Sequence, residues 1–422
     1  MDEAQKRFRR IRDLTGERFL QRQEARRAEI VEYHRSRSEW YRRKLGGRLP
    51  NRWEEIPPLR KADLIPLKPA MTPGFEPKEL YTGKTSGSSG VPLRFAKDRM
   101  SHAMTWALIL DRYRWYGLEY GKHLQARFFG IPLEGWGRHL ERIKDRIAHR
   151  RRFVVYDLSS EALDRFAESF ARHPFRYAYG YTNSLVRMGR HMKARGQVLK
   201  DVCPSLEFVI TTSEVLTPSD RQLLREGFGV PVINEYGACE LEMIAFEHPD
   251  GTWRMSDENL YLEVVDDEGR PVPDGTSGRL LLTSLTNRVV PFIRYEVGDL
   301  AVIHRELATG RTRLLELQGR LNDEAVLPSG KVVPGLTLYY TTKVIMETID
   351  GFQEYQIRQT RPDRFELDIV MNHDPNERER GEMEGAMRQY LEPGIQVKVN
   401  RVARIDRTGA GKFKHFVAEV AT

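Results

Sequence analysis

The chain has 422 residues, of which 40% are hydrophobic and 30% are charged, and its formal net charge is +8. This length exceeds what one hydrophobic core supports, so we expect two domains or one large domain with an appendage. No apolar run approaches the roughly 20 residues of a membrane-spanning helix, and the charged N-terminus lacks the apolar core of a secretory signal. The only two cysteines, Cys203 and Cys239, argue against a disulfide framework and predict a reducing compartment, by default the cytoplasm.

The surplus of basic residues does not by itself indicate nucleic-acid binding. The 68 Lys and Arg residues exceed the 60 Asp and Glu residues, and part of the surplus lies within residues 142–153. These charges alternate with acids at helical spacing, which is typical of solvated helix faces. We expect no nucleic-acid partner, and a basic, non-catalytic nucleic-acid-binding protein is kept as the alternative from another class.

The first 120 residues predict helices around a proline-rich segment. Residues 1–45 indicate one long helical stretch, and the prolines between residues 57 and 73 indicate an extended arm on the surface. A helix rich in aromatic residues is expected over residues 97–117.

The middle of the chain alternates strand-like and amphipathic segments, which predicts a parallel sheet in an α/β layer. Thr217 followed by Pro218 is a strong helix start, because the hydroxyl caps the helix and proline lacks an N–H that would go unpaired there. We expect strands at residues 176–182, 206–212 and 231–236, and helices at residues 184–195 and 218–228.

The character of the sequence changes twice more towards the C-terminus. After residue 258, strands and turns follow one another, which predicts an antiparallel or barrel-like part. After residues 317–330, two strands, a helix and further strands predict a small α+β domain. We therefore expect a boundary near Asp323, with an N-terminal domain of residues 1–322 and a C-terminal domain of residues 323–422.

The segment TGKTSGSSGVPLRF at residues 82–95 is the most distinctive stretch of the chain. A Gly-rich run can be a linker, a tight turn or a cradle for phosphate. The P-loop pattern is excluded, because Gly90 is followed by a strand-like run and not by Lys, a hydroxyl residue and a helix. On composition alone, a plain surface turn and a hairpin-like loop that wraps an oxyanion with amides and hydroxyls both stay open.

Residues 85–92 of this segment resemble the phosphate loop of the adenylate-forming enzymes. Further motifs of that superfamily follow in order: NEYGACE (234–240), IRYEVGD (293–299), GRLND (319–323) and RTGAGKFK (407–414). Within the superfamily, the chain is most similar to the phenylacetate–coenzyme A ligase group. The nearest branch is the one named for capsular-polysaccharide biosynthesis and coenzyme F390 synthetase.

The resemblance implies a fold and an activity. The fold is α/β, with a large N-terminal adenylate-forming domain, built of layered α/β subdomains and a β-barrel-like part, and a small mobile α+β C-terminal domain. The activity is ATP-dependent conversion of a carboxylic acid to an acyl-adenylate with release of pyrophosphate, followed by acyl transfer, most simply to coenzyme A. A carrier-protein arm or an amine is the alternative acceptor, and a kinase is a remoter reading. ATP, Mg²⁺ and coenzyme A are the implied cofactors and co-substrates.

The resemblance also assigns roles to residues. Lys412, Glu240 and Thr85 are implied to be catalytic, with Glu240 as the Mg²⁺ ligand and Asp323 as the hinge. The triphosphate is implied to bind at Thr85, Ser86, Gly87, Ser88, Ser89 and Gly90. Adenine and ribose are implied to bind at Ser213, Glu214, Asn234, Glu235, Tyr236, Gly237, Cys239, Asp299 and Arg320. The acyl pocket is implied to include Trp106, Phe129, Tyr179, Gly180 and Tyr181, with Phe128 as a further candidate.

Two departures from the family pattern carry expectations of their own. Cys239 stands where the superfamily usually has Thr or Ser, and a thiol is a weaker hydrogen-bond donor. Relatives with a zinc site carry several cysteines after this motif, whereas here the segment has His248 and no cysteine, so we expect no structural zinc. Aromatic and medium-sized apolar acids both stay open as substrates, as do a monomer and a homodimer.

Overall fold

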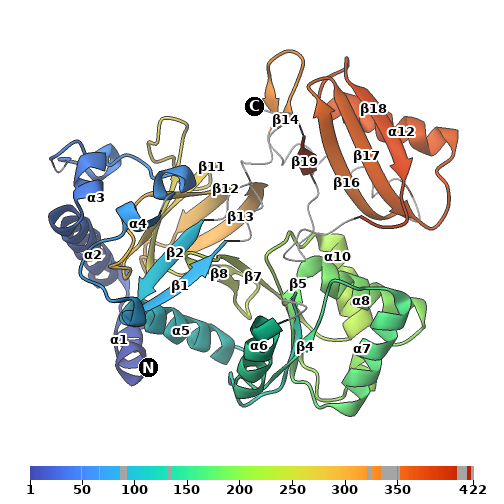
Figure 1. The fold of residues 1–422 in the computed structure, drawn as a ribbon, viewed down its shortest axis with the longest axis horizontal. Helices are drawn as coiled ribbons and strands as arrows, with labels where there is room; N and C mark the ends of the chain where they lie inside the picture. Colours follow the sequence, from blue (N-terminus) through green and yellow to red (C-terminus); the bar gives the residue numbers. More distant parts are fainter. Residues whose placement is uncertain are drawn as a thin grey trace. The chain divides into compact units, whose positions relative to one another are not determined.

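The computed structural model separates the chain into two compact units (Figure 1). The larger unit holds Met1–Val297 and Ala301–Leu317, and the smaller unit holds Gly298–Leu300 and Gln318–Thr422. The expected boundary at Asp323 lies outside the described residues and stays a prediction. The structure describes residues 1–48, 50–65, 67–85, 93–130, 135–320, 325–333, 349, 352–405 and 416–419.

The first 45 residues form three helices and not the single helical stretch that we expected. They are α1 (Asp2–Arg12), α2 (Gly16–Arg37) and α3 (Glu39–Lys44). Thr15 has an extended backbone, and Gly16 has φ of 55°, a value at which glycine is favoured. Ser38 is also extended, and its side chain accepts a hydrogen bond from the Tyr41 N–H, which starts the third helix. The breaks are therefore local capping features.

The proline-rich segment packs against the core, so the expected extended surface arm was wrong. It contains the short helical turns η1 (Trp53–Glu55), η2 (Lys61–Leu64), α4 (Leu67–Ala70) and η3 (Pro77–Glu79). Leu59 and Leu64 have no exposed surface, because both side chains join the core of the larger unit. The prolines favour turns in this segment, but burial of its apolar side chains determines that it packs against the core.

A hairpin and a helix follow. Strand β1 (Leu80–Lys84) pairs antiparallel with β2 (Arg94–Asp98), so the Gly-rich segment connects two paired strands. Helix α5 (Arg99–Arg114) begins directly after β2, and the Asp98 side chain accepts a hydrogen bond from the Ser101 N–H at its start. The expected helix at residues 97–117 is confirmed.

The predicted parallel sheet is present. Strands β3, β4, β5, β6 and β7 pair in parallel in the spatial order β4-β3-β5-β6-β7. Thr217 caps α10 and Pro218 is its first residue, as the sequence predicts. The strands are β3 (Gln125–Phe128), β4 (Arg150–Phe153), β5 (Tyr177–Tyr181), β6 (Phe208–Thr212) and β7 (Val232–Ala238), and the helices are α6 (Gly135–Ile147), α7 (Ser160–Arg172), α8 (Thr182–Ala194), α9 (Leu199–Val202) and α10 (Pro218–Phe228).

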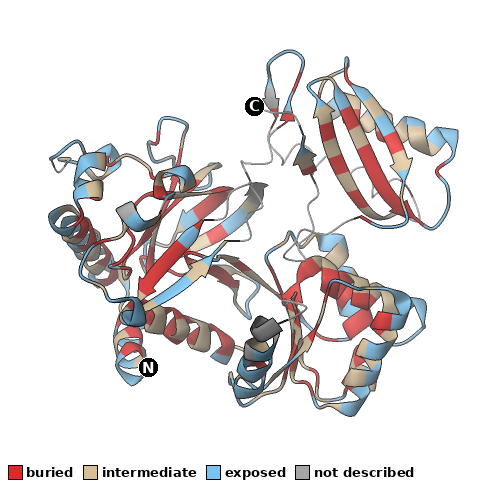
Figure 2. Ribbon diagram, in the orientation of Figure 1, coloured by how far each residue is buried: buried red, intermediate tan, exposed pale blue. Residues whose placement is uncertain are grey.

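Antiparallel strands continue the same sheet. They are β8 (Glu242–Glu247), β9 (Trp253–Met255), β10 (Leu260–Val265), β11 (Gly278–Ser284), β12 (Tyr295–Arg305) and β13 (Thr312–Arg320). The complete order is β10-β11-β12-β13-β9-β8-β7-β6-β5-β3-β4. The two faces of the parallel part pack against different cores, one including residues of α7, α8 and α10 and the other including residues of α1 and α5. Figure 2 shows the buried residues concentrated in the strands.

The smaller unit has its own sheet and core. Strand β16 (Phe352–Arg361) pairs antiparallel with β17 (Arg364–Met371), and β18 (Gln396–Arg401) and β19 (Phe416–Ala418) flank them in the order β18-β17-β16-β19. Helix α12 (Glu377–Tyr390) contributes Met383 and Met387 to the core. A short hairpin joins β14 (Ala325–Val326) and β15 (Val332–Val333). No helix in the described parts of either unit is long and apolar enough to cross a membrane.

Candidate active site

The carboxyl ends of the parallel strands form one row at the edge of the sheet. Phe128 lies opposite Gly180, and Tyr181, Thr212 and Glu235 follow across the next three strands. Ligands of open α/β sheets bind at such carboxyl ends, because the loops that follow the strands converge there. The sequence-predicted residues that lie on these strand ends or directly after them are Phe129, Tyr179, Gly180, Tyr181, Ser213, Glu214, Asn234, Glu235, Tyr236 and Gly237.

Gly180 allows strands β3 and β5 to approach closely. A Cβ atom at this position would lie 2.5 Å from the carbonyl oxygen of Phe128, which no real side chain tolerates. Phe128 itself is fully buried and stacks on Phe153 in the hydrophobic core, with ring centroids 4.8 Å apart. Phe128 is therefore a core residue, and its candidacy for the acyl pocket was wrong.

Three of the aromatic side chains predicted for the acyl pocket do meet. The Phe129 ring lies 4.5 Å from the Tyr181 ring and 5.3 Å from the Tyr179 ring, measured between centroids. Trp106, on α5, has its ring contacts with Tyr120 and His102 instead. The structure thus groups Phe129, Tyr179 and Tyr181, and the place of Trp106 in the pocket stays a prediction.

Glu235 faces this aromatic group. Its Oε1 accepts hydrogen bonds from the Tyr179 hydroxyl at 2.8 Å and from the Thr212 hydroxyl at 3.2 Å. Burial raises the pKa of Glu235 above its ordinary value, although both hydrogen bonds act in the opposite direction. We predicted Glu235 to bind adenine or ribose, and these bonds connect it to Tyr179 of the predicted acyl pocket.

Two predicted adenine residues follow β6. Ser213 is exposed and has φ of 69°, an uncommon backbone for serine of the kind that is often retained at binding sites. The Glu214 carboxylate accepts a hydrogen bond from the Asn183 N–H at 2.8 Å, near the start of α8. Two further predicted adenine residues lie on β7. Asn234 accepts a hydrogen bond from the Thr211 hydroxyl at 3.2 Å. Tyr236 is 8% exposed and lies in the core of the larger unit, so its predicted stacking on adenine stays untested.

Glu240 lies in the turn between β7 and β8. Its side chain is buried, and its Oε1 accepts a hydrogen bond of 2.8 Å from the Tyr295 hydroxyl. Among the residues that the structure describes, no Lys, Arg or His forms an ion pair with this carboxylate. A buried carboxylate without a cation is costly, and carboxylate oxygen is a ligand type that Mg²⁺ prefers. The residue therefore fits the predicted metal.

A neighbouring cluster of charged and aromatic residues was not identified from the sequence. Lys97, on β2, is almost fully buried, and its Nζ lies 2.7 Å from Oε1 of Glu242, which has φ of 63°. His102 stacks on Tyr81 with ring centroids 4.1 Å apart and lies 3.7 Å from the same carboxylate oxygen. The cluster links the hairpin β1–β2 to the segment that holds Glu240. The signal was a lysine directly after the apolar residues Phe95 and Ala96, but its partner lies 145 residues away.

The base of the predicted phosphate loop is closed by hydrogen bonds. The Thr85 N–H donates to the Leu93 carbonyl, and the Leu93 N–H donates to the Thr85 hydroxyl oxygen, both at 2.9 Å. Thr85 can still donate its own hydroxyl hydrogen to a ligand. Ser86, Gly87, Ser88, Ser89 and Gly90 lie outside the described residues.

The remaining predicted residues are placed in part. Asp299 is buried on β12 and follows Gly298, whose φ of 87° favours glycine at this position. Arg320 is the last residue of β13, and Cys239 is exposed. The backbone of Gly237 lies so close to Glu242 that a Cβ on Gly237 would be 2.5 Å from the Glu242 carbonyl oxygen. Asp323 and Lys412 lie outside the described residues.

Comparisons with known proteins show what the chain is similar to. No family model matches the chain. A phenylacetate–coenzyme A ligase from Thermus thermophilus is 31% identical over 189 residues, which cover 42% of this chain and 41% of that protein. One from Escherichia coli is 29% identical over 136 residues, 31% of each chain. Over these stretches the chain is similar to phenylacetate–coenzyme A ligases. The matches span less than half of these two relatives, and the narrower assignment to the capsular-polysaccharide branch stays a prediction.

Solved structures show the same fold over most of the chain. A 2-hydroxyisobutyryl-CoA ligase in complex with 2-HIB-AMP has a TM-score of 0.72 at 18% identity and covers 96% of this chain and 91% of its own. The anthranilate CoA ligase AuaEII, in complex with anthranoyl-AMP, has a TM-score of 0.53 at 16% identity, with 78% and 64% covered. The amide bond synthetase McbA from Marinactinospora thermotolerans has a TM-score of 0.55 at 18% identity, with 80% and 68% covered. The expected fold class is confirmed.

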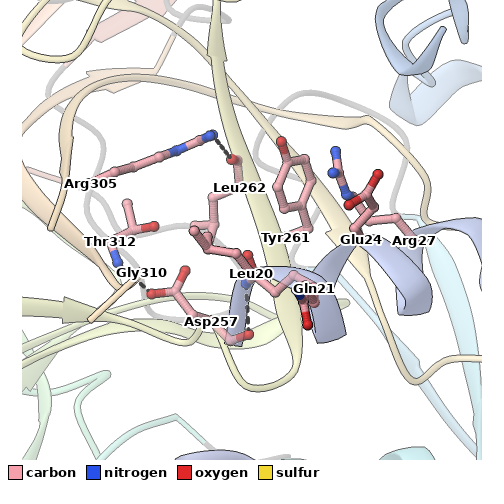
Figure 3. Close-up of a pocket in the computed structure, with 11 residues that line it drawn as sticks. Leu20, Gln21, Glu24, Arg27, Asp257, Tyr261, Leu262, Arg305, Gly310 and Thr312 are labelled. Atoms are coloured by element: carbon pink, nitrogen blue, oxygen red, sulfur yellow. Dashed lines mark hydrogen bonds between the residues drawn. The ribbon is translucent and has the colours of Figure 1, made fainter. Parts of the chain in front are cut away.

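A separate cleft in the larger unit contains none of the predicted site residues (Figure 3). Its volume is about 190 Å³, and it lies between α2 and the strands β10, β12 and β13. The Thr312 N–H donates to the Asp257 carboxylate at 2.6 Å, and Arg305 donates to the Leu262 carbonyl at 3.0 Å. Burial raises the pKa of Asp257 to about 6. The other Asp257 carboxylate oxygen, Oδ1, is buried without a hydrogen-bond partner among the described residues. The cleft is not part of the candidate site.

Proposed function

We propose that this protein is an AMP-forming acid–thiol ligase. In the first half-reaction, a carboxylate oxygen of the acid attacks the α-phosphorus of ATP, and the bond to the β-phosphate breaks, releasing pyrophosphate and leaving an acyl-adenylate. In the second, the sulfur of coenzyme A attacks the acyl carbon, the bond to AMP breaks, and a thioester forms as AMP leaves. The cytoplasm, predicted from the cysteine content, is the proposed place of this reaction.

One observation carries the proposal. Glu240 is a buried carboxylate, held by Tyr295 and without a cation among the described residues, in a turn at the carboxyl edge of the parallel strands. Such a charge needs a cationic ligand, and a motif resembling that of the adenylate-forming enzymes places the residue there. The similarity to phenylacetate–coenzyme A ligases and the fold shared with adenylate-bound ligases support the same reading.

The proposed roles follow from chemistry at each position. Glu240 would hold Mg²⁺, which supplies positive charge beside the triphosphate when bound. Thr85 would donate its hydroxyl hydrogen to a phosphate oxygen. Asp299 would accept from the ribose hydroxyls, and Lys412 would stabilise the charge that grows on the α-phosphate and the attacking carboxylate. These last three assignments rest on the family pattern.

Coenzyme A is the proposed acceptor. The 2-hydroxyisobutyryl-CoA ligase that shares the fold has been solved with both 2-HIB-AMP and CoA. The chain's excess of basic charge also suits the phosphates of coenzyme A. An amine acceptor is the second candidate, because the amide bond synthetase McbA shares the same fold.

The test is ATP–pyrophosphate exchange with a panel of carboxylic acids. We expect exchange that depends on the acid and on Mg²⁺, followed by AMP and thioester formation when coenzyme A is added. A kinase would instead release ADP, and a nucleic-acid-binding protein would show no exchange with any acid. An amide in place of a thioester, when amines replace coenzyme A, would identify the second candidate.

A further inference from the structure

A half-buried arginine lies beside the aromatic group of the predicted acyl pocket. Arg127 is on β3, directly opposite Tyr179 on β5. Its guanidinium carbon lies 4.2 Å from the centroid of the Phe129 ring and 5.2 Å from that of Tyr179. Guanidinium groups stack favourably on aromatic faces. The arginine is therefore held in place by the side chains that we expect to surround the acyl group.

Arg127 lacks the acidic partner that its neighbour has. Arg152 lies opposite Arg127 on β4 and pairs with both Asp145 and Glu141, each at 2.8 Å. Among the residues that the structure describes, no carboxylate forms an ion pair with Arg127. Within the described part of the chain, its Nη1 donates to the Gln125 side-chain oxygen at 3.3 Å, and its buried Nε has no hydrogen-bond partner there. A buried donor without an acceptor is costly, and here it lies beside the aromatic rings of the predicted pocket, where a ligand could supply the acceptor.

Glu235 supplies the complementary group. Both of its hydrogen bonds, from Tyr179 and Thr212, end on Oε1. Glu235 interacts electrostatically with Arg127 without forming an ion pair with it. Arginine only donates hydrogen bonds, and an ionised carboxylate only accepts them. A group that satisfies both must accept one hydrogen bond and donate another, and a hydroxyl does so from a single atom without adding charge.

We propose that the acid activated by this protein is an aromatic acid with a hydroxyl group on its ring, recognised by Arg127 and Glu235. The ring would pack between Phe129, Tyr179 and Tyr181, and the hydroxyl would accept from Arg127 and donate to Glu235. This inference rests on the proposed function and names its substrate class. A second carboxylate on the substrate fits less well, because it would meet the Glu235 carboxylate.

The experiment measures binding directly, so that it does not depend on turnover. Hydroxyphenylacetic acids and methylphenylacetic acids, each as the meta and the para isomer, are titrated calorimetrically into the full-length protein. Methyl and hydroxyl groups have similar volumes, so their affinity ratio isolates the hydrogen bonds. We expect the hydroxylated acid to bind at least about tenfold more tightly at one of the two ring positions. Equal affinities, or no binding by either acid, would overturn the proposal.

Substitutions at Arg127 test whether this residue causes the selectivity for a hydroxyl over a methyl group. Arg127→Met should bring the hydroxyl-to-methyl ratio below about threefold, and Arg127→Lys should retain part of it because lysine still donates. Arg151→Met, at an exposed position on the adjacent strand β4, is the matched control and should leave the ratio unchanged. A ratio that survives Arg127→Met would also overturn the proposal. If Arg127→Met does not fold, the proposal is still tested by the hydroxyl-to-methyl affinity ratio of the wild-type protein and by that of Arg127→Lys.

The two proposals fail separately. Selective binding of the hydroxylated acid without pyrophosphate exchange by any acid would contradict the ligase function and keep the pocket chemistry. Exchange with unsubstituted acids and no selectivity for a hydroxyl would keep the ligase function and contradict the role of Arg127.

Discussion

Glu240 carries a charge that the protein itself does not neutralise among its described residues. Tyr295 donates a single hydrogen bond to it, and its side chain is buried. Groups of this kind persist where a ligand supplies the missing charge, and they usually lower the stability of the ligand-free protein. Removal of this charge should therefore lower activity without lowering the stability of the ligand-free protein.

We predict that Glu240→Gln lowers acid-dependent pyrophosphate exchange by about 10²-fold or more, because charge stabilisation beside the triphosphate is lost. The amide oxygen can still accept from Tyr295, so the denaturation midpoint without ligand should be unchanged or higher. The measurements are initial exchange rates at saturating Mg²⁺ and urea denaturation. Glu226→Gln, at an exposed glutamate on α10, is the control and should change neither. An undiminished exchange rate for Glu240→Gln would remove Glu240 from the site.

At the scale of single residues, the sequence identified those that belong to contiguous motifs. Glu240 was identified because the residues before it form a motif that resembles one of the adenylate-forming enzymes. Tyr295 lies inside a quoted motif but received no role, since nothing local indicates that its hydroxyl reaches Glu240. Arg127 and Lys97 were missed because their partners come from other strands, and the distance along the chain hides such pairs.

At the scale of elements, the buried pair of Lys97 and Glu242 joins the hairpin β1–β2 to strand β8. Burial alone would raise the pKa of Glu242, but the positive charge of Lys97 and contact with His102 outweigh it and lower the pKa. The pair therefore stabilises the folded state above the ordinary pKa of a glutamate. This contribution is lost as the pH falls through the lower folded-state value.

We predict that Lys97→Met destabilises the larger unit by roughly 3–5 kcal/mol, because it leaves a buried carboxylate without its cation. Lys97→Met combined with Glu242→Gln should recover part of the loss, since both charges are then absent. Urea denaturation of the two single variants and the double variant gives the coupling energy. Strictly additive effects would show that the two side chains do not stabilise each other.

His34 connects three segments that are distant in sequence. Its Nδ1 lies 2.8 Å from the Thr72 hydroxyl in the proline-rich segment, and its Nε2 lies 3.0 Å from the Asn287 carbonyl between β11 and β12. Burial lowers the pKa of His34 from 6.5 to about 4. The unfolded chain therefore binds a proton at pH values where the folded chain does not, and stability falls as the pH drops from about 6.5 to about 4.

We predict that the larger unit loses roughly 3 kcal/mol of stability from His34 across this pH range, at about 1.4 kcal/mol per pKa unit. His34→Gln should be less stable at pH 7 and should show a flatter pH dependence. His304→Gln, at an exposed histidine, should keep the wild-type dependence. Urea denaturation at several pH values tests this, and a wild-type slope in His34→Gln would contradict it.

Helices and strands could be predicted where the residues that start or end them are neighbours in the sequence. Helix α10 was predicted from Thr217 and Pro218, which act within one turn. The breaks at Gly16 and Ser38 were missed because the charged helical pattern continues on both sides of them. The proline-rich segment was placed wrongly because its composition indicates turns, whereas burial of Leu59 and Leu64 against distant strands decides its position.

At the scale of the whole molecule, the family pattern places catalysis on both units, with Lys412 on the smaller one. We predict that Lys412→Ala abolishes adenylation but leaves acyl transfer from a supplied acyl-adenylate nearly intact, because the lysine acts on the α-phosphate only in the first step. Single-turnover transfer from synthetic adenylate to coenzyme A is the decisive measurement. Equal slowing of both half-reactions would contradict a division of labour between two arrangements of the units.

The alternation of strands and helices predicted the overall fold class, and the structural comparisons confirm it. The continuity of parallel and antiparallel strands in one sheet was not predicted. Strand β9 has three residues and was not predicted, and its pairing with β13 depends on a segment far along the chain.

The separate cores of the two units have a consequence for how heat inactivates this protein. The smaller unit buries its apolar residues among themselves, and small units bury a lower fraction of their surface than large ones do. Its melting can therefore precede that of the larger unit, and one melting temperature would not describe the chain. Heating would then abolish the proposed ligase activity while the larger unit stays folded, and cooling would restore that activity without refolding the larger unit.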